Sequence, residues 1–287
     1  MRVGIAGTGR MGTAYARRLV ETGHEVAVWN RSLGRTADAH DAGAEVVGSL
    51  ADLAECEAVI VSVRDRAAAE AVINELASAG LSGTVVVEMS TLLPEDQEAL
   101  AVSVRAAGGG FVDCPVGGTV APALKGALLG MAGGAESDLS KVRPVLDDLC
   151  KRVEHLGPVG SGARMKLAVN LPLALYWAGL AESLAVLEGS DLPGETIASV
   201  LADSSAGPAV LKNRMDVVAK AIDGTDTPGT FDIDGLAKDL ALALEWGRRQ
   251  GATMPLAGAA QGLYEAARAA GMGGLDGASL ARFAALR

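Results

Sequence analysis

This sequence of 287 residues has few of the cysteines and histidines that metal centres and disulfide frameworks require. It contains three cysteines and three histidines, which lie far apart and form no Cys-x-x-Cys pair. Zinc sites and small disulfide scaffolds both need closely spaced ligands or paired cysteines. We therefore expect no metal site and no disulfide framework, and a reduced, cytoplasmic protein is the default expectation.

An excess of positive charge is missing as well. There are 25 lysines and arginines against 35 aspartates and glutamates, which gives a net charge of −10. A chain of this charge repels a polyphosphate, so we expect no nucleic-acid partner.

The sequence gives little indication of a signal peptide or of a membrane-spanning helix. The apolar stretch at the N-terminus ends at Gly7, which is too short for the core of a signal peptide. The longest apolar run covers residues 171–187 and includes Pro172 and Glu182. This composition predicts a buried helix and no membrane partner.

The rest of the composition is typical of a globular protein, with 49% hydrophobic and 21% charged residues. At about 150 residues per domain, the length favours two domains. In the first half, short β-branched runs alternate with helical patterns, which predicts a mostly parallel, doubly wound sheet of the Rossmann type. The predicted strands cover residues 3–6, 25–29, 59–63, 84–88, 111–113 and 128–131.

The pattern changes after residue 162, beyond which we find helical segments only. They cover residues 164–188, 195–201, 209–220, 236–249, 255–270 and 278–286. The sequence therefore predicts an α/β Rossmann-type N-terminal domain, residues 1–162, followed by an all-α C-terminal domain, residues 163–287, that serves the substrate and oligomerisation.

A Gly-Thr-Gly-Arg-Met-Gly segment follows the first predicted strand and opens the first predicted helix. In a dinucleotide-binding loop, Gly7 permits the tight turn, Gly9 lets a pyrophosphate approach the backbone, and Gly12 lets the helix pack on the sheet. Arg10 and Met11 would bring the amides of the helix N-terminus to the phosphates. A glycine-rich turn without a ligand is the alternative.

The end of the second strand indicates which dinucleotide binds. NAD-preferring sites place a carboxylate there, on the ribose 2′-hydroxyl. This chain has Asn30, Arg31 and Ser32 instead. Arg31 can bind a 2′-phosphate with its guanidinium, and Ser32 can donate a hydrogen bond, so we predict NADP(H) as the cofactor. An arginine that is merely solvated in a loop is the alternative.

Lys166 and Asn170 are four residues apart and share one face of an apolar predicted helix. A lysine in such surroundings loses solvation, which favours its neutral form and suits it to acid/base chemistry. The alternative is a lysine that reaches from the helix start into water.

Six segments in this order resemble the β-hydroxyacid dehydrogenase family, which includes 3-hydroxyisobutyrate dehydrogenase and the semialdehyde reductases and is 6-phosphogluconate dehydrogenase-like. The resemblance covers nearly the whole chain. The segments are the glycine-rich loop, Asn30-Arg31-Ser32, Met89-Ser90-Thr91, the segment from Asp113 to Gly118, the Lys166–Asn170 segment and Lys238-Asp239.

The resemblance implies roles for single residues. Lys166 corresponds to the catalytic lysine of the family, and Asn170 to the amide that helps to hold the substrate. Thr91 corresponds to a contact of the nicotinamide half of the cofactor, and Val63 and Arg64 to the segment under the cofactor ribose.

Lys238 corresponds to a lysine that reaches both the cofactor and the substrate. An ion pair with Asp239 or Glu245 is the alternative for this lysine.

The chain departs from the family pattern in the substrate loop. A serine usual in the family is replaced by Gly117, and a glycine by Thr119. Either the amides of Gly117 and Gly118 bind a substrate carboxylate together with the Thr119 hydroxyl, or the substrate lacks that carboxylate. Pro172 is a second oddity, and we expect it to bend its helix.

These observations predict an NADPH-dependent oxidoreductase that acts on a short semialdehyde or 3-hydroxy acid, with a lysine as general acid/base. Two alternatives stay open, an imine reductase on the same fold and an NADPH-binding module without catalysis. The partner is a small-molecule substrate, and the apolar run of residues 171–187 predicts a homodimer or homotetramer.

Overall fold

The computed structural model describes residues 1–187, 189–229 and 231–286. The chain forms two compact units, Met1–Lys166 and Leu167–Arg287. A single helix, α7 (Ser161–Ala185), begins in the first unit and continues into the second. The boundary predicted at residue 162 falls in the first turn of this helix.

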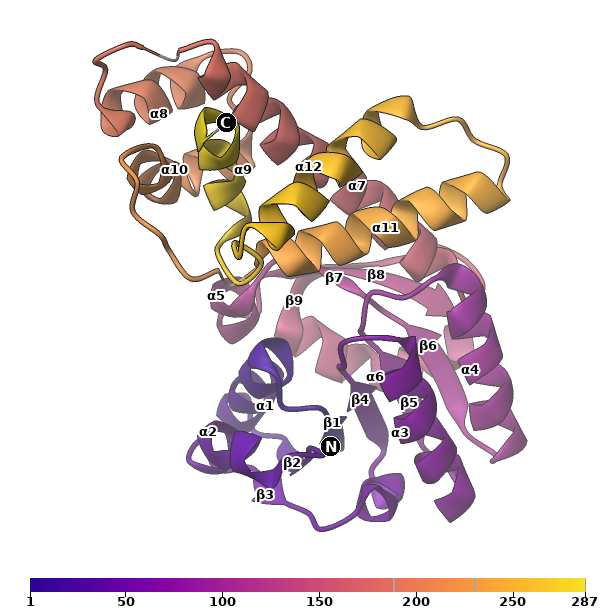
Figure 1. Ribbon diagram of the computed structural model, residues 1–287. Helices are drawn as coiled ribbons and strands as arrows, with labels where there is room; N and C mark the ends of the chain where they lie inside the picture. The colour runs from indigo at the N-terminus through magenta and orange to yellow at the C-terminus, as the bar shows by residue number, and fades with distance from the viewer. Residues whose placement is uncertain (188, 230, 287) are drawn as a thin grey trace. The chain divides into compact units, whose positions relative to one another are not determined.

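The first unit is built on a sheet with the strand order β3-β2-β1-β4-β5-β6-β8-β7, and β9 pairs with β8 (Figure 1). The first six strands pair in parallel, whereas β8 runs antiparallel to β6 and β7. The bounds are β1 (Arg2–Ala6), β2 (Glu25–Trp29), β3 (Glu45–Val46), β4 (Ala58–Val61), β5 (Val85–Glu88), β6 (Gly110–Asp113), β7 (Val116–Gly117), β8 (Leu128–Gly134) and β9 (Cys150–His155).

Helices or 3-10 helices connect successive strands, except β6 and β7, and they cover both faces of this sheet. They are α1 (Arg10–Glu21), α2 (Ala37–His40), α3 (Arg66–Ala79), α4 (Pro94–Ala106), α5 (Val120–Leu124) and α6 (Glu136–Leu149), with two short 3-10 helices, η1 (Leu33–Arg35) and η2 (Leu50–Glu55). Parallel neighbours need crossover connections, which explains the alternation of strands and helices along the chain.

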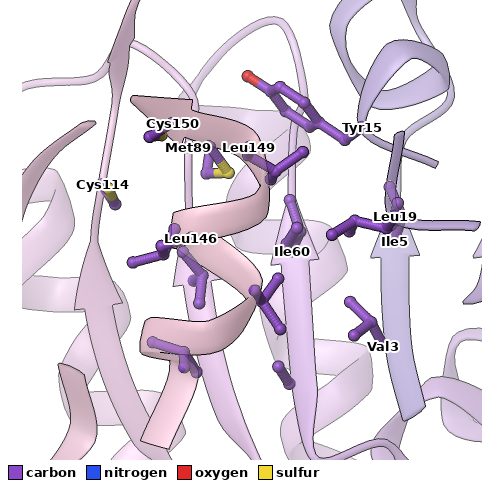
Figure 2. Close-up of a cluster of buried hydrophobic side chains, with 14 of the residues drawn as sticks. Val3, Ile5, Tyr15, Leu19, Ile60, Met89, Cys114, Leu146, Leu149 and Cys150 are labelled. Carbon is purple, nitrogen blue, oxygen red and sulfur yellow. The ribbon is translucent and has the colours of Figure 1, made fainter. Parts of the chain in front are cut away.

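The middle of the sheet is apolar on both faces because the central parallel strands β4 and β5 are buried on two sides. Ile60 of β4 packs with residues of α1 and α6, whereas Val59 and Val61 pack with residues of α3 and α4. Figure 2 shows Leu146 and Leu149 of α6 against this first face, near Ile60. This explains why the central strands have continuous apolar sequences.

The second unit is helical. It contains most of α7, then α8 (Gly194–Asp203), α9 (Ala209–Lys212), α10 (Met215–Ile222), α11 (Ile233–Arg249), α12 (Pro255–Ala269) and the 3-10 helix η3 (Gly277–Leu286). Trp177, Leu180 and Leu184 of α7 lie in its core, and the Tyr264 hydroxyl donates to the carbonyl of Ala174 at 3.0 Å. By length and composition alone α7 could cross a membrane, but these buried side chains make it a core helix of the unit.

The predicted fold class is confirmed, and the structure adds elements that the patterns did not predict. The helix α6 and the strands β3, β7 and β9 were missed, and the segment predicted as one helix, residues 209–220, is divided between α9 and α10. In β9 only Cys150 and Val153 are buried, and the charged residues between them hide the strand pattern. Pro144 lies inside α6, where a proline argues against a helix.

Candidate active site

The glycine-rich loop joins β1 to α1, and its glycines meet different constraints. A Cβ on Gly7, whose φ is 103°, would overlap the carbonyl oxygen of Ser62. A Cβ on Gly12 would overlap the carbonyl oxygen of Gly7. A Cβ on Gly9 would meet no atom of the described residues within 4 Å. The fold therefore requires two of the glycines, and the third leaves the backbone open to a ligand.

The first turn of α1 is suited to an anion. Gly9 is the N-cap residue of α1, and it has no side chain that could accept a hydrogen bond. The amides at the start of the helix, beginning with those of Arg10 and Met11, therefore receive no side-chain cap from Gly9. The hydroxyl of Thr8 is buried and has no hydrogen-bond partner in the part of the chain that the structure describes. A helix N-terminus favours phosphate, so the loop fits the pyrophosphate of a dinucleotide.

Asn30 connects the end of β2 to this loop. Its Oδ1 accepts from the Thr8 amide at 3.2 Å, and its Nδ2 donates to the carbonyl of Ser32 at 2.9 Å. Asn30 therefore holds the glycine-rich loop in place by hydrogen bonds to the backbone of Thr8 and Ser32. The sequence motif did not indicate this role. Arg31 and Ser32 are exposed and accessible to a ligand.

A cleft of about 500 Å³ borders the glycine-rich loop and is lined by three arginines, of which the sequence had singled out only Arg10. Arg10 and Arg17 of α1 and Arg35 of η1 line it together with Thr8. Arg35 lies four residues after Arg31, and this spacing was the signal that could have indicated it. The cleft provides a local positive charge in an acidic protein.

Lys166 is 9% exposed, and its Nζ donates to the carbonyl oxygen of Val116 at 2.8 Å. Val116 directly precedes the predicted substrate loop, Gly117 to Thr119. Both belong to the first unit, so the structure brings the predicted catalytic lysine to the predicted substrate loop.

The two glycines of the substrate loop differ in what they require. Gly118 has a φ of 125°, and a Cβ there would lie 2.7 Å from a Leu128 methyl group. A Cβ on Gly117 would lie 3.6 Å from the Cβ of Leu129, an ordinary contact. A side chain fits at position 117, so this departure from the family pattern is not imposed by the backbone.

Glu88 is a buried carboxylate at the end of β5 that the motifs did not indicate. Its oxygens accept from the Ser90 amide at 3.1 Å and from Gln97 Nε2 at 2.6 Å. Burial raises the pKa of Glu88 to about 7, although these hydrogen bonds act against the shift. The hydroxyl of Ser90 accepts from the Val63 amide at 2.9 Å and so ties Val63 to the segment before Thr91.

Asp113 stands beside Glu88 in the pairing of β5 with β6. It accepts from the amides of Gly160 and Ala163, each at 2.8 Å, with one carboxylate oxygen for each amide. Burial raises the pKa of Asp113 to about 7, and the amides act in the opposite direction. Its sequence signal, a carboxylate at the end of a strand, was part of the resemblance but carried no role.

In the second unit, Asp239 connects two residues that the sequence singled out. Asn170 Nδ2 donates to Asp239 Oδ2 at 2.6 Å, and Lys238 Nζ lies 3.1 Å from Asp239 Oδ1. The ion pair considered as the alternative for Lys238 is therefore present. Asp239 is buried, and its position next to Lys238 in the sequence was the signal for it.

Comparisons with protein families match both parts of the chain. The NAD-binding domain of 6-phosphogluconate dehydrogenase matches residues 2–157, and the NAD-binding domain of NADP-dependent 3-hydroxyisobutyrate dehydrogenase matches residues 160–284. The chain belongs to the β-hydroxyacid dehydrogenase family.

Relatives of this β-hydroxyacid dehydrogenase are similar over nearly their whole length. Glyoxylate/succinic semialdehyde reductase 1 of Arabidopsis thaliana is 31% identical over 96% of both chains. The 2-(hydroxymethyl)glutarate dehydrogenase of Eubacterium barkeri is 31% identical over 96% of this chain and 92% of its own. The solved 3-hydroxyisobutyrate dehydrogenase of Salmonella typhimurium is 25% identical with a TM-score of 0.88, over 98% and 99% of the two chains.

A further solved structure, in complex with NADP+ and 2-OPP, is 26% identical with a TM-score of 0.85 and covers 99% of this chain and 100% of its own. The β-hydroxyacid dehydrogenase described here is thus an enzyme that uses a nicotinamide cofactor to oxidise hydroxyl groups or reduce aldehydes of a small molecule. This confirms the predicted family and enzyme class, while the roles of single residues stay predictions.

Within residues 1–187, 189–229 and 231–286, no group of three or more His, Cys, Asp or Glu side chains is placed to hold a metal ion.

Proposed function

We propose that the enzyme is an NADPH-dependent reductase of a short semialdehyde, and in the reverse direction a dehydrogenase of the matching 3-hydroxy acid, with Lys166 as the general acid/base. The observation that carries this proposal is the buried amino group of Lys166 at the carbonyl of Val116, next to the loop from Gly117 to Thr119. The names of the relatives, which include semialdehyde reductases and hydroxyacid dehydrogenases, support the substrate class.

The nicotinamide cofactor, when bound, supplies the hydride. Lys166 Nζ donates a proton to the substrate oxygen as the carbonyl becomes an alcohol, and neutral Lys166 takes it back in the reverse direction. Asn170 holds the substrate through its amide, and Asp239 keeps that amide oriented. The amides of Gly117 and Gly118 and the Thr119 hydroxyl bind a substrate carboxylate. A positioned proton donor contributes about 10²–10⁴-fold to the rate.

The cofactor is held by the residues around the glycine-rich loop. The open backbone at Gly9 and the first turn of α1 take the pyrophosphate. Arg31 and Ser32, with Arg35 beside them, take the 2′-phosphate, since no carboxylate stands at the end of β2. The nicotinamide half is assigned to Val63, Arg64, Thr91 and Lys238. The NADP-dependent family model and the NADP+ complex support the choice of NADPH.

The proposed function is tested by measuring NADPH oxidation with glyoxylate, with the semialdehydes of tartronate, succinate and methylmalonate, and with cyclic imines. The same assays with NADH test the preference for NADPH. We expect turnover of a semialdehyde that falls by about 10²-fold or more in Lys166→Ala. The exposed Arg164 of the same helix gives the control, and Arg164→Ala should keep the rate within about twofold of wild type. Turnover of imines alone, or a rate indifferent to Lys166, would contradict the proposal.

We further propose that residues 163–287 serve the substrate and oligomerisation, that the enzyme is a homodimer or homotetramer, and that it works in the cytoplasm. Apolar side chains exposed on and beside α7 and α8 support the oligomer, among them Val169, Val186 and Val200.

A further inference from the structure

The start of α7 is anchored on the carboxyl end of β6. Both oxygens of Asp113 are used, because Gly160 N donates to Oδ1 and Ala163 N donates to Oδ2, each at 2.8 Å. Asp113 is fully buried. A carboxylate at a helix N-terminus satisfies amides that the helix itself leaves unpaired and interacts favourably with the helix dipole. One side chain of the sheet thereby fixes the first turn of this helix.

Two glycines bring the helix close enough for this contact. A Cβ on Gly162 would overlap the carbonyl oxygen of Met131 and lie 2.9 Å from Asp113 Oδ2. A Cβ on Gly133 of β8 would lie 2.5 Å from Asp113 Oδ1 and 2.7 Å from the carbonyl oxygen of Pro158. The backbone of the helix therefore packs directly on Asp113 and β8, which leaves little freedom for the helix to shift.

Lys166 lies three residues after Ala163 in α7. Its Nζ contacts the same segment of the first unit that contains Asp113. The acceptor of Nζ is the carbonyl of Val116, three residues after Asp113. The strand end and the helix start are thus joined twice, once by the Asp113 carboxylate and once by the Lys166 side chain. The short stretch of helix between the two contacts places Nζ at the substrate loop.

We infer that Asp113 is a positioning residue for Lys166, holding the first turn of α7 so that Nζ is presented at the substrate loop. This inference rests on the proposed role of Lys166. Asp113 acts through the amides of Gly160 and Ala163 and takes no proton from the substrate itself. Its loss therefore acts on the rate of the chemical step, while the cofactor loop between β1 and α1 is left intact.

A double-mutant cycle tests the inference. Asp113→Asn keeps the shape of the side chain but replaces one of the two acceptors by a donor. We expect kcat to fall by about tenfold or more with the Kd for NADPH unchanged, and no further fall when Asp113→Asn is added to Lys166→Ala. An unchanged kcat in Asp113→Asn, or a loss that multiplies with that of Lys166→Ala, would overturn the inference.

Asp138→Asn is the matched control, because Asp138 Oδ2 accepts from the Phe111 amide at the other end of the same strand. The same chemical change there should leave kcat within about twofold of wild type. If it lowers kcat as much as Asp113→Asn does, disturbance of β6 explains both losses and the inference is overturned.

A measurement on the wild type keeps the inference testable if Asp113→Asn does not fold. Amide hydrogen exchange of Gly160 and Ala163, followed by NMR, should be slowed to the rate of the core amides of β6. Exchange as fast as that of exposed loop amides would overturn the inference. If Lys166→Ala has no effect on the rate, the proposed function fails and the inference with it. If Lys166→Ala is inactive and Asp113→Asn keeps full kcat, only the inference fails.

Discussion

Gly117 is the residue at which the substrate loop departs from the serine usual in the family. A Cβ there makes only an ordinary 3.6 Å contact with Leu129, so a serine fits without moving the loop. A hydroxyl bound to a carboxylate contributes roughly 1.5–3 kcal/mol. We expect Gly117→Ser to lower the KM for a substrate with a carboxylate by about tenfold or more, measured by initial rates of NADPH oxidation.

Gly118→Ser is the control for this prediction, because its φ of 125° and the nearby Leu128 leave no place for a side chain. It should lower the thermal stability and the activity together. An unchanged KM in Gly117→Ser would indicate that the substrate has no carboxylate at this loop.

Glu88 makes the stability of the protein depend on pH. Burial raises its pKa from 4.5 to about 7, so the folded chain keeps a proton that the unfolded chain releases between these values. The resulting stabilisation is complete below pH 4.5 and is lost as the pH rises through 7. We expect Glu88→Gln to flatten this dependence and to raise the free energy of unfolding at pH 8 by up to about 3 kcal/mol.

Urea unfolding of wild type and Glu88→Gln at about pH 5 and about pH 8 measures this difference. The amide of Gln97 can turn so that its oxygen, which has no partner among the described residues, accepts from the new amide. Glu136→Gln on the surface, whose side chain is 85% exposed, is the control and should leave the pH dependence as in wild type. Equal slopes for wild type and Glu88→Gln would contradict the prediction.

The helix α7 contains two glycines with opposite requirements. Gly162 packs its backbone on Met131 and Asp113, where a Cβ would overlap, whereas a Cβ on Gly179 would meet no described atom within 4 Å. We expect Gly162→Ala to lower the free energy of unfolding by roughly 2 kcal/mol or more, because the helix must move away from Met131 and Asp113 to make room for the methyl group. Gly179→Ala should raise it by up to about 1 kcal/mol through helix propensity. Both values come from urea unfolding, and equal effects at the two positions would contradict the close packing.

Secondary structure was predictable where one local rule dominated. The central strands are apolar because they are buried on both faces, and the glycine-rich loop follows from the turn between β1 and α1. The strand β9 and the helix α6 were not predictable from such rules. The buried residues of β9, Cys150 and Val153, are three positions apart and so break the alternation of a strand, and Pro144 interrupts the helical pattern of α6.

For the candidate site, the residues within short motifs were predictable and their supports were not. Lys166 and Asn170 stand four apart on one helix, and this spacing is visible in the sequence. Asp113 meets Gly160 from 47 residues away, and Asp239 meets Asn170 from 69 residues away. Both carboxylates stand in motifs that the sequence shows, but only the fold brings these pairs together, so no local pattern could indicate which residues Asp113 and Asp239 orient.

The whole molecule has a mass of 29.0 kDa as one chain and a net charge of −10. Exposed apolar side chains such as Val186 and Val200, with exposed fractions of 84% and 65%, favour association of copies. We expect light scattering to give the mass of two or four chains. Val200→Lys should reduce this mass if its surface is the interface, with Leu256→Lys, at another exposed apolar position, as the control. A mass of one chain would contradict the proposed oligomer.

Because α7 starts in one compact unit and ends in the other, the two units cannot be exchanged freely between family members. In a hybrid joined in the loop before Ser161, the first turn of α7 comes from the other family member and packs on Asp113 of this chain. That first turn must have glycine at position 162, because a Cβ there would overlap its neighbours. A hybrid joined after Lys166 keeps the native anchoring and exchanges only the later part of the helix and the rest of the second unit. Recombination within this family is therefore expected to succeed at crossover points inside the helix rather than in the glycine-rich segment before it.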